Sequence, residues 1–144
     1  MSVINNTIDL IETKLLENAN WGPSSSDIYW GNLEDGNTQI PQADLPKTLV
    51  FIEQAPQTEA TSLSDETEYI IQVKNFSWVG SVAHTKANMK TALDLHNEFV
   101  TIYNNIVENL DCAWLTDYLN FDYENIDDRL ILQERFSITV TENR

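Results

Sequence analysis

The sequence predicts an α+β domain in which two helices pack on one face of a largely antiparallel four-stranded sheet, in the chain order α-β-β-α-β-β. The run 84–110 repeats apolar residues at the spacing of an amphipathic helix. Two further runs, 48–79 and 113–141, are rich in strand-forming residues and lie before and after it. The length of 144 residues suits a single domain, 1–144, with one hydrophobic core.

Two segments have the pattern of helices. The N-terminal segment, 1–19, places four apolar residues at helical spacing: Ile4, Ile8, Ile11 and Leu15. The long segment, 84–110, has two favourable N-cap residues near its start, Ser81 and Thr85. Its predicted buried stripe contains Met89, Leu93, His96, Val100, Tyr103, Val107 and Leu110, widened by Ala92, Phe99 and Ile106. The His96 imidazole is therefore expected to pack in the core.

The remaining regular segments read as two hairpins. In 48–79, an apolar strand and a second strand flank a polar, acidic loop, 55–67, which is too long for a tight turn. The C-terminal hairpin, 113–141, contains the clearest alternation. One face of its last strand carries Leu130, Leu132, Phe136, Ile138 and Val140. Along its first strand, Leu115, Leu119, Phe121 and Tyr123 are expected to share a face, opposite Thr116, Tyr118, Asn120 and Asp122.

The segment 20–47 reads as an extended polar arm that contains large aromatic residues. Turn-forming residues, together with Pro41 and Pro46, argue against a long helix. The aromatic side chains must nevertheless bury their area. They either fold back over the core of their own subunit or dock on a neighbouring subunit. The candidates for a subunit contact are Trp21, Tyr29 and Trp30.

The charge balance is strongly acidic. The chain has 23 acidic and 8 basic residues, which gives a net charge of −15. Proteins that bind duplex nucleic acid normally carry the opposite charge, so we do not expect this chain to bind it directly. No Lys or Arg lies between Thr91 and Asp128. The carboxylates form either a solvated surface that promotes solubility or a negative wall that faces something anionic. Candidates for an acidic surface or lumen are Asp117, Asp122, Glu124, Asp127 and Asp128, and candidates for a partner contact near the acidic loop are Glu59, Asp65 and Glu66.

The chain carries no recognisable catalytic motif. Cys112 is the only cysteine and His84 and His96 are the only histidines, and their spacing is not that of metal ligands. We therefore expect no enzyme activity, no metal and no cofactor. We also expect no secretory signal and no membrane span, because no sufficiently long apolar run is present.

Four segments of the chain, taken in order, resemble segments of a known protein family. The segments are 45–51 (LPKTLVF), 69–73 (YIIQV), 92–99 (ALDLHNEF) and 128–140 (DRLILQERFSITV). In this order they resemble the small tail terminator, or tail completion, proteins of tailed bacteriophages. The resemblance implies a virion protein, assembled in the host cytoplasm, whose copies form a ring, usually a hexamer. Such a ring caps the tail tube and joins it to the head connector, and DNA passes through the lumen without specific binding.

Two other functions fit the same residues. The net charge equally suits an acidic inhibitor that mimics DNA and blocks a DNA-binding protein. Such an inhibitor should be a monomer or a dimer with carboxylates spaced like phosphates along one face. A small enzyme of unrecognised type is the third class.

Overall fold

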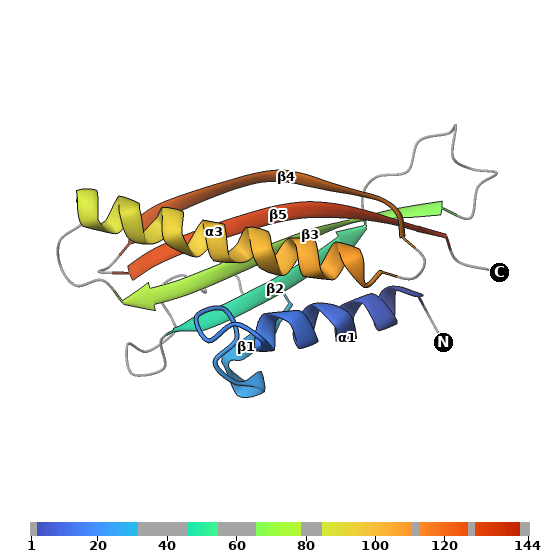
Figure 1. Ribbon diagram of the computed structural model, residues 1–144, viewed down its shortest axis with the longest axis horizontal. Helices are drawn as coiled ribbons and strands as arrows, with labels where there is room; N and C mark the ends of the chain where they lie inside the picture. The colour runs from blue at the N-terminus through green and yellow to red at the C-terminus, as the bar shows by residue number, and fades with distance from the viewer. Residues whose placement is uncertain are drawn as a thin grey trace.

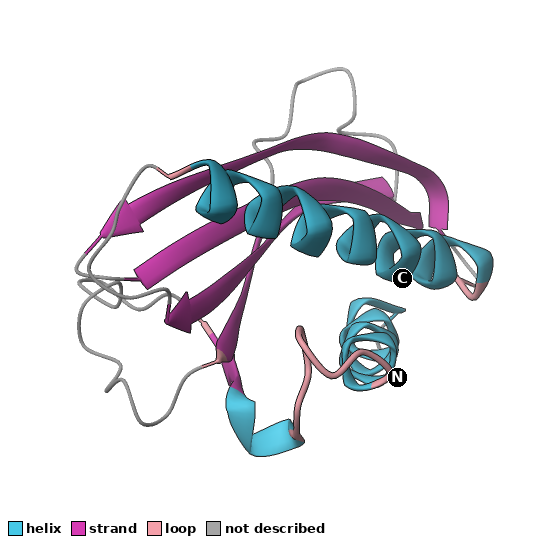
Figure 2. Ribbon diagram, turned by 60° about the vertical axis from the view of Figure 1, so that its left-hand side comes forward, coloured by secondary structure: helices cyan, strands magenta, loops and turns pink. Residues whose placement is uncertain are grey.

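The computed structural model describes residues 3–31, 46–54, 66–78, 85–110, 113–126 and 129–141. Its regular elements are, in chain order, α1 (Val3–Leu16), the short 3-10 helix η1 (Ser25–Asp27), β1 (Ile28–Trp30), β2 (Lys47–Gln54), β3 (Glu66–Trp78), α3 (Lys86–Glu108), β4 (Ala113–Ile126) and β5 (Arg129–Thr141). The α+β class is confirmed. Both long helices lie on the same face of one curved sheet (Figures 1 and 2).

The sheet has five strands rather than the four that the sequence predicts. Their spatial order is β1-β2-β3-β5-β4. Three neighbouring pairs are antiparallel, whereas β1 runs parallel to β2. The prediction missed β1 because a three-residue strand is too short to show an alternating pattern. This strand places part of the expected arm at the edge of the sheet.

The hairpin boundaries differ slightly from the prediction. Glu66 and Thr67 were assigned to the acidic loop, but both already pair with β5. The rest of that loop, 55–65, lies outside the described residues. The two strands of the predicted C-terminal hairpin are present, and β4 and β5 pair from Ala113 and Val140 to Ile126 and Arg129.

The helix α3 turns a different face to the sheet from the one predicted. Thr85 caps it, as expected, because its side chain accepts a hydrogen bond from the Asn88 backbone N–H at 3.1 Å. The buried residues are Asn88, Ala92, Leu95, Phe99, Ile102 and Ile106. The predicted centre of the stripe is therefore wrong: Met89, Leu93, Val100 and Val107 are 36–45% exposed. The sequence contains two adjacent apolar stripes, and spacing alone does not say which one meets the sheet.

The end of α1 is fixed against the core by Trp21. This side chain is fully buried, its ring lies 4.9 Å from that of Phe99, and its Nε1 donates to the Leu95 carbonyl at 3.1 Å. Gly22 allows this approach, because a Cβ at that position would collide with the Leu15 backbone. Trp21 thus follows the first alternative for the aromatic residues and folds back over its own core.

The strand β4 does not alternate in the simple way predicted. Its register with β5 shifts between Ala113 and Leu115 and again between Tyr118 and Asn120. The second shift is typical of a β-bulge, which changes the face to which the following residues point. Tyr118 consequently shares the helix-covered face with Phe121 and Tyr123, and all three pack against the main core. The predicted separation of Tyr118 from Phe121 is wrong for this reason.

Candidate functional site

A fully buried carboxylate lies between the sheet and α3. Glu134 occupies an inward position of β5, between the core residues Leu132 and Phe136, and is 0% exposed. The sequence prediction passed over this position. The signal was nevertheless present, because an acidic residue at an inward position of a strongly alternating strand is rarely buried without partners.

Two side chains from other elements satisfy this carboxylate. The Nδ1 atom of His96 lies 2.7 Å from Oε2 and 3.0 Å from Oε1 of Glu134. The Tyr118 hydroxyl donates a short hydrogen bond to Oε1. We call Glu134, His96 and Tyr118 the Glu134 cluster. The His96 ring also stacks on Phe121, with 3.8 Å between centroids and 12° between planes. The cluster therefore ties α3, β4 and β5 together.

The electrostatics of the Glu134 cluster follow from its burial. Burial raises the pKa of the Glu134 carboxyl, and the hydrogen bonds from Tyr118 and His96 oppose that increase. Burial and the neighbouring carboxyl also raise the pKa of the Tyr118 hydroxyl. Within the described ranges, no group of three or more His, Cys, Asp or Glu side chains is placed to hold a metal ion. The arrangement joins α3, β4 and β5 and satisfies the buried carboxylate.

A row of exposed carboxylates runs along β4. By register, Asp117 lies beside Ser137, Asp122 beside Gln133 and Glu124 beside Ile131. These residues point to the sheet face turned away from the helices, which we call the outer face, because their strand neighbours Tyr118, Phe121 and Tyr123 point to the core. Asp117, Asp122 and Glu124 are all exposed, and none forms an ion pair with another described residue. We call these three residues the acidic row.

The other predicted acidic candidates are not brought to this row by the structure. Asp127 and Asp128 follow β4 but lie outside the described residues, as do Glu59 and Asp65. Glu66 begins β3, two strands away from β4. The structure therefore groups three of the predicted acidic residues on one strand.

The predicted aromatic contacts separate into different environments. Trp21 is buried in the core of its own subunit. It offers no surface to a neighbour, so it is not part of the predicted subunit contact. Tyr29 is half-buried, and Lys47 Nζ lies 5.4 Å from the centre of its ring. Trp30 is 41% exposed on the edge strand β1. Only Trp30 remains largely accessible for a subunit contact.

The end of the arm is anchored by a partly buried ion pair. Lys47 Nζ lies 2.5 Å from Asp27 Oδ1, which joins the start of β2 to η1. Hydrogen bonds from Lys47 and Ser24 lower the pKa of the Asp27 carboxyl. Thr48 also donates to the Trp21 carbonyl. These contacts hold β1 beside β2 and fix the position of Trp30.

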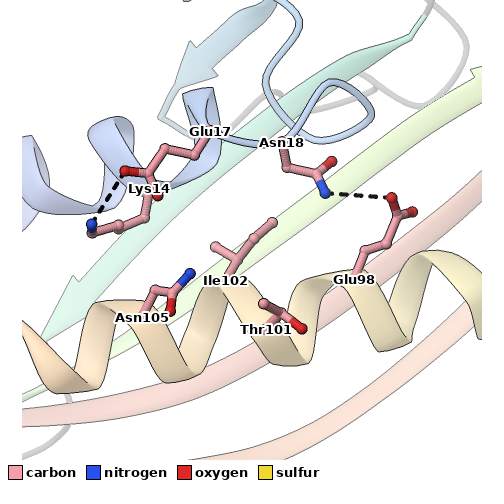
Figure 3. A pocket seen from close by; sticks show the side chains of 7 residues that line it. All are labelled: Lys14, Glu17, Asn18, Glu98, Thr101, Ile102 and Asn105. Atoms are coloured by element: carbon pink, nitrogen blue, oxygen red, sulfur yellow. Dashed lines mark hydrogen bonds and ion pairs between the residues drawn. The ribbon is translucent and has the colours of Figure 1, made fainter.

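A polar pocket of about 200 Å³ opens between α1 and α3 (Figure 3). Four of its polar side chains bond with one another in two pairs. Lys14 Nζ lies 3.2 Å from Glu17 Oε1, and the Asn18 side-chain amide donates to Glu98 at 3.4 Å. Asn20 donates to the same carboxylate at 2.9 Å. The pocket thus resembles a hydrogen-bonded seam between the two helices more than a ligand site.

Comparison with known proteins gives a likeness of fold. No protein-family model and no curated protein sequence matches this chain. One solved structure, 11% identical in sequence, covers 100% of this chain and 99% of its own, with a TM-score of 0.53. A second, from Akkermansia muciniphila, is 9% identical and covers 98% of this chain and 77% of its own, with a TM-score of 0.34. The first shares the fold, and the second is too distant to add to it.

Among the described helices, none has the length and apolar character needed to cross a lipid bilayer.

Proposed function

We propose that this chain is a structural subunit of a bacteriophage tail, a tail terminator or tail completion protein whose copies form a ring around the path of the DNA. The observation that carries the proposal is the acidic row on the outer face of the sheet. Asp117, Asp122 and Glu124 are exposed and form no ion pair with other described residues. A ring that presents this face to its lumen gives the DNA a negative wall.

A negative lumen suits passage rather than binding. Phosphates are repelled by carboxylates within about 8 Å at physiological ionic strength, the screening length of the solution. Passing DNA therefore finds no site at which to adhere, whereas a basic lumen would release counterions and hold it. The net charge of −15 extends the same field over the whole subunit.

The sequence resemblance supplies the rest of the proposal. In the family that the sequence resembles, the subunits form a ring, usually a hexamer, which caps the tail tube and meets the head connector. Trp30 on the edge strand β1 and the exposed apolar residues of α3 belong to different elements of the subunit. Two unlike surfaces allow the head-to-tail contacts that close a ring. We expect the tail tube and connector proteins as the other partners, within the virion.

The DNA-mimic inhibitor stays as the alternative, because the acidic row supports it too. Asp122 and Glu124 are two residues apart on one strand, which separates them by about 7 Å, comparable with the spacing of successive phosphates. A mimic should be a monomer or dimer that binds a basic partner tightly. A tail subunit should instead form a ring and show no such affinity.

The acidic row is tested by neutralising it. We expect the Asp117→Asn/Asp122→Asn variant to keep the assembled mass of the wild type and to be retained more strongly by duplex DNA at low salt. The control, Asp9→Asn/Glu12→Gln on α1, changes the net charge equally and should leave DNA retention near the wild-type level. Equal retention of both variants would remove the acidic row from the DNA path.

A further inference from the structure

The exposed side of α3 carries an apolar stripe that nothing in the described part of the fold covers. Met89, Leu93, Val100 and Val107 are 45%, 42%, 36% and 36% exposed. At 100° per residue these four positions fall within an arc of about 40° around the helix axis. We call them the α3 stripe. It extends from residue 89 to residue 107, a rise of about 27 Å along the helix.

Charged residues flank the α3 stripe in an asymmetric way. Lys86 and Lys90 lie at the N-terminal end of the helix and Glu108 at its C-terminal end, and all three are exposed. Neither lysine forms an ion pair with another described residue. Lys90 and Glu108 are 18 residues apart, which is about five whole turns, so they lie on the same flank of the stripe.

This pattern is complementary to itself. We propose that two copies of this chain dock through their α3 stripes, with the helices antiparallel. A two-fold axis near residue 99 then sets Lys90 of one copy against Glu108 of the other, twice in each pair. The apolar side chains meet along the centre, where Val100 lies closest to the axis. A parallel pair would instead leave Lys90 of one copy and Glu108 of the other about 27 Å apart along the helix axis, so these opposite charges would not meet.

The charge of the whole chain favours the α3 stripe over other surfaces as the contact between two copies. Subunits with a net charge of −15 repel one another over most of their surface. Two of the 8 basic residues in the chain, Lys86 and Lys90, lie one turn apart beside the exposed α3 stripe. Association at this surface therefore replaces repulsion with attraction. The pairing does not depend on the proposed tail function, since it also describes a dimer of a protein with another role.

The core of each copy leaves room for the contact. The residues of α3 that face the sheet, such as Leu95, Phe99 and Ile102, lie about 100° or more around the helix from the stripe. The stripe therefore lies on a side of α3 that does not face the sheet. His96 and Tyr103 occupy the sector between the stripe and the sheet, where they contact Tyr118 and Phe136. These aromatic contacts hold α3 in the orientation that exposes the stripe.

The pairing is tested by a charge swap in the full chain, followed by sedimentation velocity over a range of concentrations. We expect Lys90→Glu and Glu108→Lys each to weaken self-association on the order of tenfold, because each places two like pairs across the axis. We expect the double variant Lys90→Glu/Glu108→Lys to restore association to within about twofold of the wild type, because the same pairs are reformed with their signs exchanged.

Matched controls separate this contact from a general effect of net charge. Lys74→Glu and Glu68→Lys make the same changes on the outer face of the sheet, away from the acidic row. Net charge alone would make Glu108→Lys associate more tightly, since it reduces repulsion, whereas the pairing requires it to associate more weakly. Failure of the double variant to recover association would overturn the proposal, as would single variants that behave like their controls. If every charge-swap variant kept the mass of the ring, the pairing would be overturned, whereas the tail proposal would be unaffected.

Discussion

At the scale of single residues, Glu134 is the position where burial and charge conflict most. Its carboxylate is fully buried and is satisfied by the His96 ring and the Tyr118 hydroxyl, while the exposed Asp122 adds a repelling charge from β4. A buried carboxylate with partners costs less than one without, but a well-packed neutral group often costs less still. Glu134 therefore ties three elements together at some expense in stability.

The replacement Glu134→Gln tests this balance through its pH dependence. Burial raises the folded-state pKa of Glu134 above its ordinary value of 4.5, so the folded state binds more protons than the unfolded state above that pH. This contribution to stability is fully present below pH 4.5 and is lost as the pH rises through the folded-state pKa. Glutamine does not titrate, so the variant lacks this loss.

We accordingly expect the unfolding free energy of the wild type to fall relative to that of Glu134→Gln as the pH rises above about 4.5, a direction set by the raised pKa of Glu134. Urea unfolding measured at a series of pH values gives this difference directly. Parallel stability curves for the two proteins would show that Glu134 does not titrate differently in the folded state.

At the scale of elements, the arm 20–47 shows how differently neighbouring aromatic residues are used. Trp21 closes the core beneath α3, whereas Trp30 sits exposed at the sheet edge. The sequence predicts that both side chains need burial. It does not show which of them packs in the core of its own subunit and which stays at the surface. That assignment depends on β1, whose parallel pairing with β2 is set by contacts such as the Lys47–Asp27 ion pair. Such long-range contacts leave no periodic signal in the sequence.

Alanine replacements at these two positions should separate stability from assembly. We expect Trp21→Ala to cost about 3–5 kcal/mol of unfolding free energy, as is usual when a large buried aromatic side chain is removed. Trp30→Ala should change stability by less than about 1 kcal/mol and should weaken self-association. Thermal unfolding combined with sedimentation distinguishes the two effects. Comparable losses of stability in both variants would contradict the different burial of the two residues.

The elements themselves were largely predictable from local patterns, and their orientations were not. The alternation in β5 and the helical spacing of α3 gave the correct elements because each pattern extends over many residues. The rotation of α3 and the bulge after Tyr118 depend on packing between distant segments. The Glu134 cluster was missed for the same reason, because its members come from positions 96, 118 and 134. The acidic row was predicted as candidates, but its common face follows only from the observed register.

At the scale of the whole molecule, the proposed function depends on assembly. A single subunit has the acidic row on its outer face, a helix-covered face, and exposed apolar residues at α3 and β1. Only a ring turns the acidic row into the wall of a channel. The antiparallel pairing through α3 would join two subunits, or two rings, in addition to the contacts that close a ring. The assembled mass therefore separates the tail subunit from the DNA mimic.

Native mass spectrometry of the full chain measures that assembled mass most directly. With a subunit mass of 16.5 kDa, a hexameric ring has a mass of about 99 kDa, six times the subunit, and pairing of two rings doubles it. We expect a closed oligomer of this kind, with no intermediate that grows indefinitely with concentration. A mass that stays at one or two subunits at high protein concentration would contradict the ring and favour the acidic inhibitor.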